Sequence, residues 1–460
     1  MSKIKKYDSI VIGSGQAGNP LVFDLAGRGQ KVALIEKNEL GGSCINFGCT
    51  PTKTLIASSN LNYRVLNSSN LGVIVENVEL DFRKVISRKN DIVKSFRSSI
   101  EKGVKNNKKI YLYRGVGSFI DKNTIKIDLN DGGEEKIQAD KIFINSGSKP
   151  KIIPIDGLEN VDYYDSTSIM ELTELPEHLV IIGTGYIALE FSQMFKRFGS
   201  KVTVIGRSGR IIKIEDEDIS NRMQEILEED GIEFLLNTDT KKIEKNGNKT
   251  NIYVERSKRK EKIECSHLMI ATGRVSVVDN LKLENTNVKL DEKGNIKVSD
   301  KLKTDEDNIY ALGDVKGGPK FTHIAYDDYR IIIDHIFGED KRNIKDRYVP
   351  FTLFTQPQLG RVGLTEKESK EKGYEVKVVK LEMKNVGKAI EEGMTKGFMK
   401  AVINKEDHKI LGVAVLGLQG GEIMAIVQIA MMAGMKYEVL RDAIFTHPSL
   451  SESLNNLFST

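Results

Sequence analysis

Two stretches of the chain show the same order of apolar, glycine-rich and helix-like segments. In the first, an apolar run at 7–12 leads through a glycine-rich turn into a helix-like segment that reaches Gly27, and a second apolar run follows at 31–35. In the other, a run at 179–182 begins the same series, which ends with a run at 201–205. The pattern predicts two βαβ units, each with two parallel strands joined by a helix.

Glycines mark the turn of the first predicted unit, which reads Gly13-Ser14-Gly15-Gln16-Ala17-Gly18. Glycines at these places let the backbone approach a pyrophosphate, and the helix N-terminus that follows supplies N–H donors. Glu36 ends the second strand, where a carboxylate can accept hydrogen bonds from a ribose. Strand, turn, helix, second strand and acid together predict a dinucleotide site.

The second unit repeats the first two glycines of the first unit, has alanine in place of the third, and lacks the acid. Without that carboxylate a 2′-phosphate on the ribose meets no repulsion, and guanidinium groups can bind the phosphate bidentately. Two nucleotide-binding units indicate two different nucleotides, and we expect the second to be NADPH, with NADH or a merely solvated basic loop as alternatives. The turn of the second unit contains Gly183, Gly185 and Ala188. Gly206 takes the position that corresponds to Glu36, and the basic residues Arg207, Arg210 and Lys213 follow it.

A pair of cysteines follows the first unit directly. Cys44 and Cys49 lie in the stretch 41–53, whereas Cys265 stands far off. At this spacing an ideal helix separates residues by about 7.5 Å along its axis, and a disulfide needs Cα atoms within about 7 Å, so the segment must bend if the sulfurs are to bond. Gly48 is where a bend costs least. Two ordinary buried cysteines are the alternative, and a metal site is disfavoured because no second cysteine pair or histidine cluster accompanies the pair.

Other boundaries and elements follow from the same patterns. Pro150 and Pro154 mark a domain boundary, and the composition changes again after Arg347. A helix rich in Met and Ala near the C-terminus is typical of a core or a subunit interface. Helices are expected at 52–65, 82–105, 219–229, 323–337, 422–433 and 437–444, and strands within 111–127, 141–144, 231–236, 268–270, 309–314, 351–354, 376–381, 397–403 and 411–416.

Composition narrows the class of protein. The chain has 460 residues, 39% of them hydrophobic and 29% charged, and a net charge of +4, which is too balanced to indicate nucleic-acid or membrane binding. The basic residues at 258–260 are followed by Glu261, as in a solvated hairpin. No stretch approaches the roughly 20 apolar residues of a membrane span, and residues 1–7 contain no apolar signal core. We therefore expect a cytoplasmic protein, in which a close cysteine pair favours catalysis or metal binding over structure.

With these features the chain resembles the class I FAD-dependent pyridine nucleotide–disulfide oxidoreductases, which include glutathione reductase, dihydrolipoamide dehydrogenase and mercuric reductase. The resemblance extends over essentially the whole length. The segments FTHIAYDDYRI and RDAIFTHPSLSESLNNLF are most similar to the mercuric-reductase-like branch associated with oxidative or reactive-chlorine stress. The other matching motifs are GGSCINFGCTPTK at 41–53, GTGYIALE at 183–190, ATGR at 271–274, ALGDV at 311–315 and THPSLSE at 446–452.

The resemblance implies a catalytic role for each matching residue. Cys44 is expected to attack the disulfide substrate, and Cys49 to contact the flavin. Lys53 and Glu190 are expected to pair near flavin N5, and Tyr186 to cover the nicotinamide pocket until the coenzyme enters. His447, oriented by Glu452, is the implied general acid–base and comes from the partner subunit, which requires a homodimer.

Cofactor-binding residues are predicted from the glycine turns and the resemblance together. Asp314 is the implied contact of the FAD ribityl chain, and Thr322 and His323 begin a helix that is expected to face the flavin. No metal ligands are predicted. The full set for FAD and NADPH is Gly13, Gly15, Gly18, Glu36, Ser43, Lys53, Gly117, Gly147, Gly183, Gly185, Arg207, Lys213, Gly273, Arg274, Asp314, Thr322 and His323.

The implied fold class is α/β, with two Rossmann-like dinucleotide-binding domains and a C-terminal α+β dimerisation domain. The expected boundaries are 1–149 and 275–342 for a discontinuous FAD domain, 150–274 for the NAD(P)H domain and 343–460 for the interface domain.

The implied function is transfer of electrons from NADPH through FAD and a Cys44–Cys49 disulfide to a small-molecule or small-protein disulfide of the glutathione, lipoamide or other thiol type. The alternatives are reduction of a metal ion or quinone in oxidative-stress defence, and a non-catalytic flavoprotein redox sensor. Efficient Hg(II) handling is not expected, because no cysteine follows Cys265. Asn145-Ser146-Gly147 replaces the Ala-Thr-Gly of many relatives, a change expected to be neutral for FAD binding.

Overall fold

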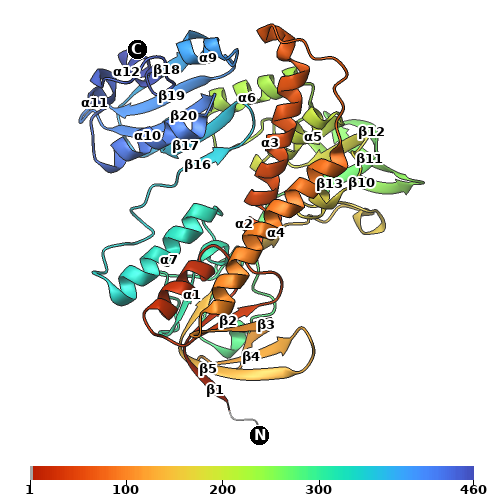
Figure 1. Ribbon diagram of the computed structural model, residues 1–460. Helices are drawn as coiled ribbons and strands as arrows, with labels where there is room; N and C mark the ends of the chain where they lie inside the picture. The colour runs from red at the N-terminus through yellow and green to blue at the C-terminus, as the bar shows by residue number, and fades with distance from the viewer. Residues whose placement is uncertain (1–3) are drawn as a thin grey trace. The chain divides into compact units, whose positions relative to one another are not determined.

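The computed structural model describes residues 4–460 (Figure 1). Residues 1–3, which begin both the predicted FAD domain and the segment without a signal core, lie outside that range. The chain forms two compact units, and the helices α3 and α4 contribute residues to both. Unit 1 comprises the chain up to residue 54, 87–151 and 274–347, and unit 2 comprises 55–86, 152–273 and 348–460.

Unit 1 is built on a parallel sheet with strand order β3-β2-β1-β5-β15, in which β4 pairs antiparallel with both β3 and β5. Ile10 and Ile12 of β1 face one side and Val11 the other, and all three are buried because both faces of the sheet are covered. The strands are β1 (Lys5–Ile12), β2 (Val32–Glu36), β3 (Ile110–Phe119), β4 (Thr124–Leu129), β5 (Glu134–Ile144) and β15 (Ile309–Ala311), with β6 (Ser148–Pro150) and β14 (Arg274–Ser276) as a separate pair.

The helices of unit 1 include α1 (Gly18–Gly27) and α7 (Thr322–Phe337), which pack against each other on the Val11 side of the sheet (Figure 1). The two predicted strands and the helix between them thus form the first βαβ unit, as the sequence indicates. The redox stretch begins immediately after β2. It forms α2 (Gly42–Phe47) and α3 (Cys49–Leu66). The short helix η1 (Ser68–Leu71), which belongs to unit 2, and then α4 (Phe82–Asn106) follow, whereas η4 (Leu283–Asn285) and η5 (Gly313–Lys316) belong to unit 1.

Unit 2 contains the second βαβ unit in a parallel sheet with strand order β13-β7-β8-β9. A three-stranded antiparallel sheet, β10-β11-β12, follows, and its second turn carries the basic residues for which a hairpin is predicted. The elements are β7 (His178–Ile182), α5 (Tyr186–Phe198), β8 (Lys201–Ile205), α6 (Glu217–Glu229), β9 (Glu233–Leu235), β10 (Thr238–Asn246), β11 (Lys249–Arg256), β12 (Arg259–Cys265), β13 (His267–Ile270), η2 (Leu158–Asn160) and η3 (Ser168–Glu171).

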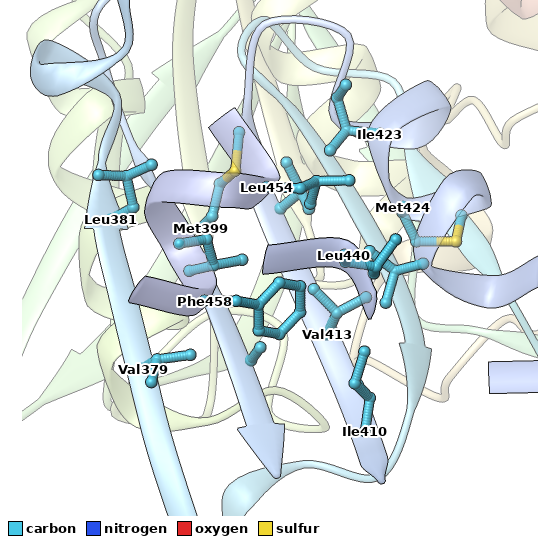
Figure 2. Close-up of a cluster of buried hydrophobic side chains, with 14 of the residues drawn as sticks. Val379, Leu381, Met399, Ile410, Val413, Ile423, Met424, Leu440, Leu454 and Phe458 are labelled. Atoms are coloured by element: carbon cyan, nitrogen blue, oxygen red, sulfur yellow. The ribbon is translucent and has the colours of Figure 1, made fainter. Parts of the chain in front are cut away.

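An antiparallel sheet with strand order β16-β17-β20-β19-β18 completes unit 2. Side chains along each strand point alternately to the two faces of this sheet. One of these faces is apolar and packs under three helices, α10, α11 and α12, around Phe458 (Figure 2). The elements are β16 (Phe351–Leu353), β17 (Gln358–Gly363), α8 (Glu366–Glu371), β18 (Val376–Glu382), η6 (Met383–Asn385), α9 (Gly387–Glu391), β19 (Phe398–Asn404), β20 (Ile410–Gly417), α10 (Gly420–Met432), α11 (Tyr437–Asp442) and α12 (Ser453–Ser459).

The predicted α/β class, with two parallel βαβ units and an α+β C-terminal region, is confirmed. The three-domain boundaries stay a prediction. Within residues 4–460, no helix combines the length and the apolar character that a bilayer crossing requires.

Candidate active site

The two cysteines lie on either side of a break between two helices. Cys44 belongs to α2, Cys49 is the first residue of α3, and Gly48 separates them. A Cβ atom on Gly48 would lie 2.8 Å from the carbonyl oxygen of Ser43 and 3.3 Å from the Cα atom of Cys44. Only glycine fits so close an approach, and the predicted bend at Gly48 is confirmed.

Both cysteines are thiols in this structure, Cys44 half-buried and Cys49 exposed. The hydrogen bond with Cys49 and burial raise the pKa of the Cys44 thiol above its usual range, while Thr322 and Lys53 lower it by less. The sulfur of Cys49 lies 3.3 Å from Oγ1 of Thr322, and its place at the N-terminus of α3 favours a negative charge on it. Cys44 therefore needs a base to become a nucleophile at neutral pH, whereas Cys49 sits where a thiolate is stabilised.

The redox helices pack directly on the first glycine turn. The hydroxyl of Ser14 accepts a hydrogen bond from the backbone N–H of Gly41 at 3.1 Å and donates to Oε2 of Glu36 at 2.7 Å. Gly42 has φ +61°, and a Cβ atom on it would lie 2.6 Å from the Cα atom of Gly15. The turn and the cysteines thus form one site within unit 1. Glu36 is buried and holds the turn, and its contact with a ribose stays a prediction.

Asn145 lies at the centre of this site, although the sequence suggests that it is neutral. Its Nδ2 donates to the carbonyl oxygen of Gly13 at 3.2 Å. Cβ atoms on Gly15 and Gly18 would lie 2.9 and 2.7 Å from Nδ2, and one on Gly313 would lie 2.8 Å from Oδ1. The Asn145 amide thus joins the first glycine turn to the Gly313 turn. No local signal marks it, because its neighbours are remote in sequence.

Asp314 is held by a short chain of polar contacts in unit 1. Its Oδ2 accepts a hydrogen bond from the hydroxyl of Ser148 at 2.5 Å, and Arg274 donates from Nε to that hydroxyl at 2.8 Å. Buried Asp328 of α7 accepts from the N–H of Gly313 at 2.8 Å. The structure therefore fixes the orientation of the predicted ribityl contact.

The second glycine turn lies in unit 2 and is followed by exposed basic residues. A Cβ atom on Gly206 would lie 2.5 Å from Cγ2 of Thr184, so no side chain fits at the position of the missing acid. Arg207 and Lys213 are exposed. Arg210 instead donates to the carbonyl oxygens of Lys213 and Glu215, at 3.1 and 3.3 Å. Two of the three cations thus remain suited to a phosphate.

Tyr186 and Glu190 occupy the first two turns of α5. The hydroxyl of Tyr186 donates to Oε1 of Glu215 at 3.3 Å, and its ring lies 5.2 Å from that of Phe351. Glu190 is buried, and its Oε1 accepts from the N–H of Phe354 at 3.0 Å. These contacts all lie within unit 2. Lys53 belongs to unit 1, and its pairing with Glu190 stays a prediction.

His447 and Glu452 are in contact near the C-terminus. Nδ1 of His447 lies 2.9 and 3.0 Å from the two oxygens of Glu452, and 75% of the imidazole side chain is exposed. The carboxylate fixes the ring and leaves Nε2 toward solvent. Exposed apolar side chains lie on α10, in the turn after it, on α11 and just before His447. We call this set the apolar face, and its members are Ile429, Met432, Met435, Val439 and Ile444.

The remaining predicted cofactor residues lie at turns or helix starts, except Gly117, which lies in β3. Gly147 and Gly273 have positive φ, Gly185 precedes α5, Gly117 packs on Ile35, and Ser43 lies in α2. The ring of His323, in the first turn of α7, stacks on Phe321 with centroids 5.5 Å apart. Across residues 4–460, no group of three or more His, Cys, Asp or Glu side chains is arranged to hold a metal ion.

Comparisons with known proteins give a consistent result. The family model described as pyridine nucleotide-disulphide oxidoreductase matches residues 7–328, and the dimerisation domain of that family matches 349–458. "Probable pyridine nucleotide-disulfide oxidoreductase RclA" of Escherichia coli K12 is 38% identical over 99% of both chains. A mercuric reductase of Staphylococcus aureus is 34% identical over 97% of this chain and 81% of its own length, and a dihydrolipoyl dehydrogenase of Bacillus subtilis is 32% identical over 98% of both.

Solved structures agree with these relatives. The Cu(II) complex of the HOCl-induced flavoprotein disulfide reductase RclA from Escherichia coli superimposes with a TM-score of 0.91, at 37% identity over 99% of both chains. Another structure of the HOCl-induced flavoprotein disulfide reductase RclA from Escherichia coli superimposes with a TM-score of 0.90, at 37% identity over 98% of this chain and 99% of that one.

Proposed function

Because the chain belongs to the pyridine nucleotide-disulphide oxidoreductase family, we propose that it is an FAD-dependent reductase that uses NADPH to reduce a disulfide substrate. Membership of the family implies FAD and a pyridine nucleotide, and the dimerisation domain indicates a homodimer. The observation that carries the proposal is the pair of thiols, Cys44 and Cys49, that meet across the break at Gly48 beside the first glycine turn.

The residues of unit 1 suit FAD. The glycine turn leaves room for a pyrophosphate, the N-terminus of α1 supplies N–H donors, and Asp314 presents a fixed carboxylate. When bound, FAD accepts a hydride from a nicotinamide and passes an electron pair to a disulfide.

The cysteines carry out the reaction with the substrate. The Cys44 thiolate attacks one sulfur of the substrate disulfide and releases the other as a thiol, which leaves a mixed disulfide. Cys49 then attacks Cys44, releases the second substrate thiol and closes the Cys44–Cys49 disulfide. One substrate disulfide thus becomes two thiols while the protein dithiol is oxidised.

Cys44 needs a proton acceptor, because its thiol pKa is raised. The exposed His447–Glu452 pair offers one, since a neutral imidazole oriented by a carboxylate can take the proton and return it to the leaving thiol. The apolar face beside His447 supports a second copy of the chain as the partner that brings this pair to Cys44, because exposed apolar surfaces of this kind mark protein interfaces.

Serine substitutions test the proposal. Cys44→Ser and Cys49→Ser should each abolish disulfide-dependent NADPH oxidation, measured by absorbance with glutathione, lipoamide and coenzyme A disulfides. Cys265→Ser is the matched control, because Cys265 is distant in sequence and is buried in unit 2, among apolar residues of β7 and β13. Full turnover in either active-site variant would contradict the mechanism.

Reduction of Cu(II) is a second candidate, supported by the description of a related structure as a Cu(II) complex. A dithiol can reduce two Cu(II) ions to Cu(I) as it becomes a disulfide and releases two protons. This reaction has no leaving thiol to protonate, so His447→Ala should lower disulfide turnover and leave Cu(II) reduction largely intact. Slow NADPH oxidation with every disulfide, quinone and Cu(II) would instead favour a redox sensor.

A further inference from the structure

An acidic segment, residues 215–218, ends the loop that follows β8 and begins α6. The five-stranded sheet of unit 2 meets this segment with one of its two faces, opposite to the face that carries the buried hydrophobic cluster of Figure 2. Arg361 and Lys400 are both register partners of Ala414, and Lys380 is the partner of Lys400. These three cations therefore lie on one face of the sheet, in a line that runs from β17 across β20 and β19 to β18. We call them the basic row.

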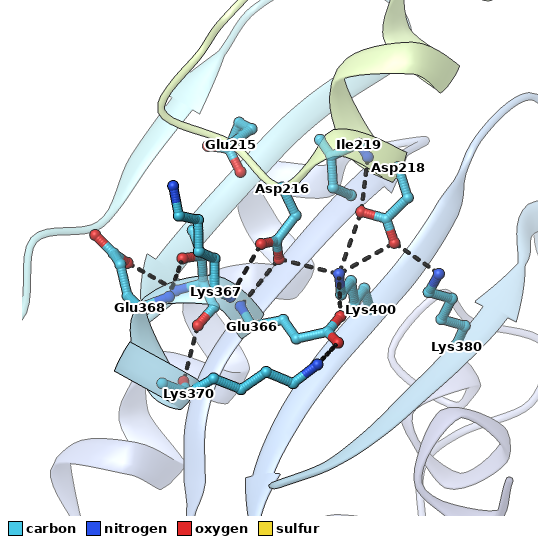
Figure 3. A network of polar contacts seen from close by, with 12 residues as sticks. Glu215, Asp216, Asp218, Ile219, Glu366, Lys367, Glu368, Lys370, Lys380 and Lys400 are labelled. Atoms are coloured by element: carbon cyan, nitrogen blue, oxygen red, sulfur yellow. Dashed lines mark hydrogen bonds and ion pairs between the residues drawn. The ribbon is translucent and has the colours of Figure 1, made fainter. Parts of the chain in front are cut away.

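Two cations of the basic row, Lys400 and Lys380, bind the acidic segment (Figure 3). Nζ of Lys400 lies 3.0 Å from Asp216 and 3.1 Å from Asp218, and Lys380 lies 2.6 Å from Asp218. Only 3% of the Lys400 side chain is exposed. A buried cation with several carboxylates is costly to disrupt, because removing one partner leaves the others unpaired away from water. The end of the loop that follows β8 is thus fixed to the sheet.

Arg361, at the other end of the row, holds Glu215, and Glu215 holds Tyr186. Nε of Arg361 lies 3.3 Å from Oε2 of Glu215, with side-chain exposures of 5% and 1%. The other oxygen, Oε1, accepts the hydrogen bond from the Tyr186 hydroxyl at 3.3 Å. Burial raises the pKa of the Glu215 carboxyl, and Arg361 opposes that shift. The three side chains form a continuous path from buried Arg361 on β17, through buried Glu215, to half-buried Tyr186 at the start of α5.

We propose that Arg361 and Glu215 are a latch that holds Tyr186 in its resting position, so that the C-terminal sheet sets how readily a nicotinamide coenzyme enters. The inference rests on the proposed function and on the role that the family resemblance implies for Tyr186, which is to cover the nicotinamide pocket until the coenzyme enters. Arg361 and Glu215 act as positioning residues, since they reach the coenzyme only through Tyr186.

The latch affects coenzyme affinity through a simple equilibrium. A coenzyme that binds only when Tyr186 has moved has an apparent Kd equal to its intrinsic Kd divided by the fraction of open protein. A hydrogen bond to a buried carboxylate favours the closed form. Weakening the latch should therefore tighten NADPH binding and leave the reaction with the disulfide unchanged.

Tyr186→Phe removes only the donor of the latch, and the paired Glu215→Gln and Arg361→Gln substitutions remove its charges together. Each should lower the apparent Kd for NADPH by about three- to tenfold, equivalent to about 0.6–1.4 kcal/mol. Combining all three substitutions should give no further gain, because they break the same link. Anaerobic stopped-flow measurement of flavin reduction gives the Kd, and the KM for the disulfide should not change.

Lys380→Met is the matched control, because Lys380 lies in the same basic row and contacts Asp218 but not Glu215; it should leave the NADPH Kd unchanged. Equal or weaker NADPH binding by Tyr186→Phe, or additive effects, would overturn the latch. If the protein with the paired Glu215→Gln and Arg361→Gln substitutions fails to fold, the result for Tyr186→Phe still decides the test. If neither NADPH nor NADH reduces the flavin of the unmodified protein, the proposed function falls, and the latch with it.

Discussion

The two βαβ units can be compared at their glycine turns, where Gly13 has a φ of +101° and Gly183 a φ of +130°. A Cβ atom on either residue would lie 2.3 Å from a backbone carbonyl oxygen, of Asn145 in the first unit and of Ala271 in the second. The same positive φ and the same close approach recur because each turn passes close to the residue that follows the neighbouring parallel strand, β5 in the first unit and β13 in the second. The two turns therefore share their backbone conformation at this first glycine.

The side chains around the turns differ. In the first unit Glu36 is buried and bound to Ser14, and Asn145 joins the turn to that of Gly313. In the second unit Gly206 replaces the acid, Ala271 replaces the amide, and Arg207 is exposed. The first site is tied together by buried polar contacts, as suits a cofactor that stays bound. The second is open and basic, as suits a coenzyme that exchanges at every turnover.

Gly13→Ala and Gly183→Ala should have the largest effects and should separate the two sites. Each adds a methyl group that meets a backbone oxygen and holds alanine at positive φ, a strain of at least about 1–3 kcal/mol. Gly13→Ala should purify with little FAD, whereas Gly183→Ala should retain FAD that NADPH no longer reduces. Absorbance spectra and anaerobic titration measure both outcomes.

Gly132→Ala is the control for this pair, because Gly132 has φ +97° with no atom within 4 Å of its would-be Cβ. It should keep FAD and react with NADPH. Normal reduction of Gly183→Ala by NADPH would contradict the assignment of the second unit.

His447→Ala should affect neither nucleotide site but should lower disulfide turnover by about 10²- to 10⁴-fold. Because the pKa of Cys44 is raised, the residual activity should increase as the pH rises and more thiolate forms. Steady-state rates between pH 6 and 10 test this. The matched control is His408→Ala, which removes another exposed histidine paired with a carboxylate, Glu438; its rate and pH profile should match those of the unmodified protein.

Arg207→Ala and Lys213→Ala should lower kcat/KM for NADPH by about 10- to 100-fold in combination, the loss expected for charge-assisted bonds to a phosphate. NADH has no 2′-phosphate, so its kcat/KM should stay the same. Lys201→Ala removes a cation from the opposite end of β8 and should change neither value. A clear preference of the unmodified protein for NADH would contradict the proposal that NADPH is its coenzyme.

Asn145→Ala should have the smallest effect, because it removes one hydrogen bond, worth about 0.5–1.5 kcal/mol, and makes the first unit more like the second. FAD should dissociate about two- to tenfold more readily, as measured by equilibrium dialysis. Asn123→Ala is the control, since Nδ2 of Asn123 also donates to a backbone carbonyl, of Ala139, but away from the turns. Equal FAD affinity in both variants would mean that Asn145 is neutral, as the sequence suggests.

Local sequence patterns were sufficient for both βαβ units and for the bend at Gly48. Alternation, helical periodicity and glycine turns depend on neighbours within a few residues, and the strand at 201–205 has the same bounds in the structure. The pattern missed β17, because the glycines at 360 and 363 interrupt its apolar residues. It also gave no sign of the basic row, which exists only once four strands are in register.

The residues of the site can also be divided into those that local sequence identifies and those that it does not. Cys44 and Cys49 could be found because their spacing and the glycine between them are local. Asn145 and Glu215 could not, because their contacts come from residues that folding alone brings near, such as Gly313 and Arg361. His447, the partner proposed for Cys44 in proton transfer, would come from a second copy of the chain, and no local pattern encodes such a contact.

The most direct test of the account is to map thiols in the FAD-loaded, oxidised protein after anaerobic addition of NADPH. Alkylation followed by mass spectrometry should label Cys44 and Cys49 only when NADPH is present, and a substrate disulfide added before the alkylating reagent should abolish that labelling. Flavin that NADPH bleaches while both cysteines stay unlabelled would contradict electron transfer through this pair.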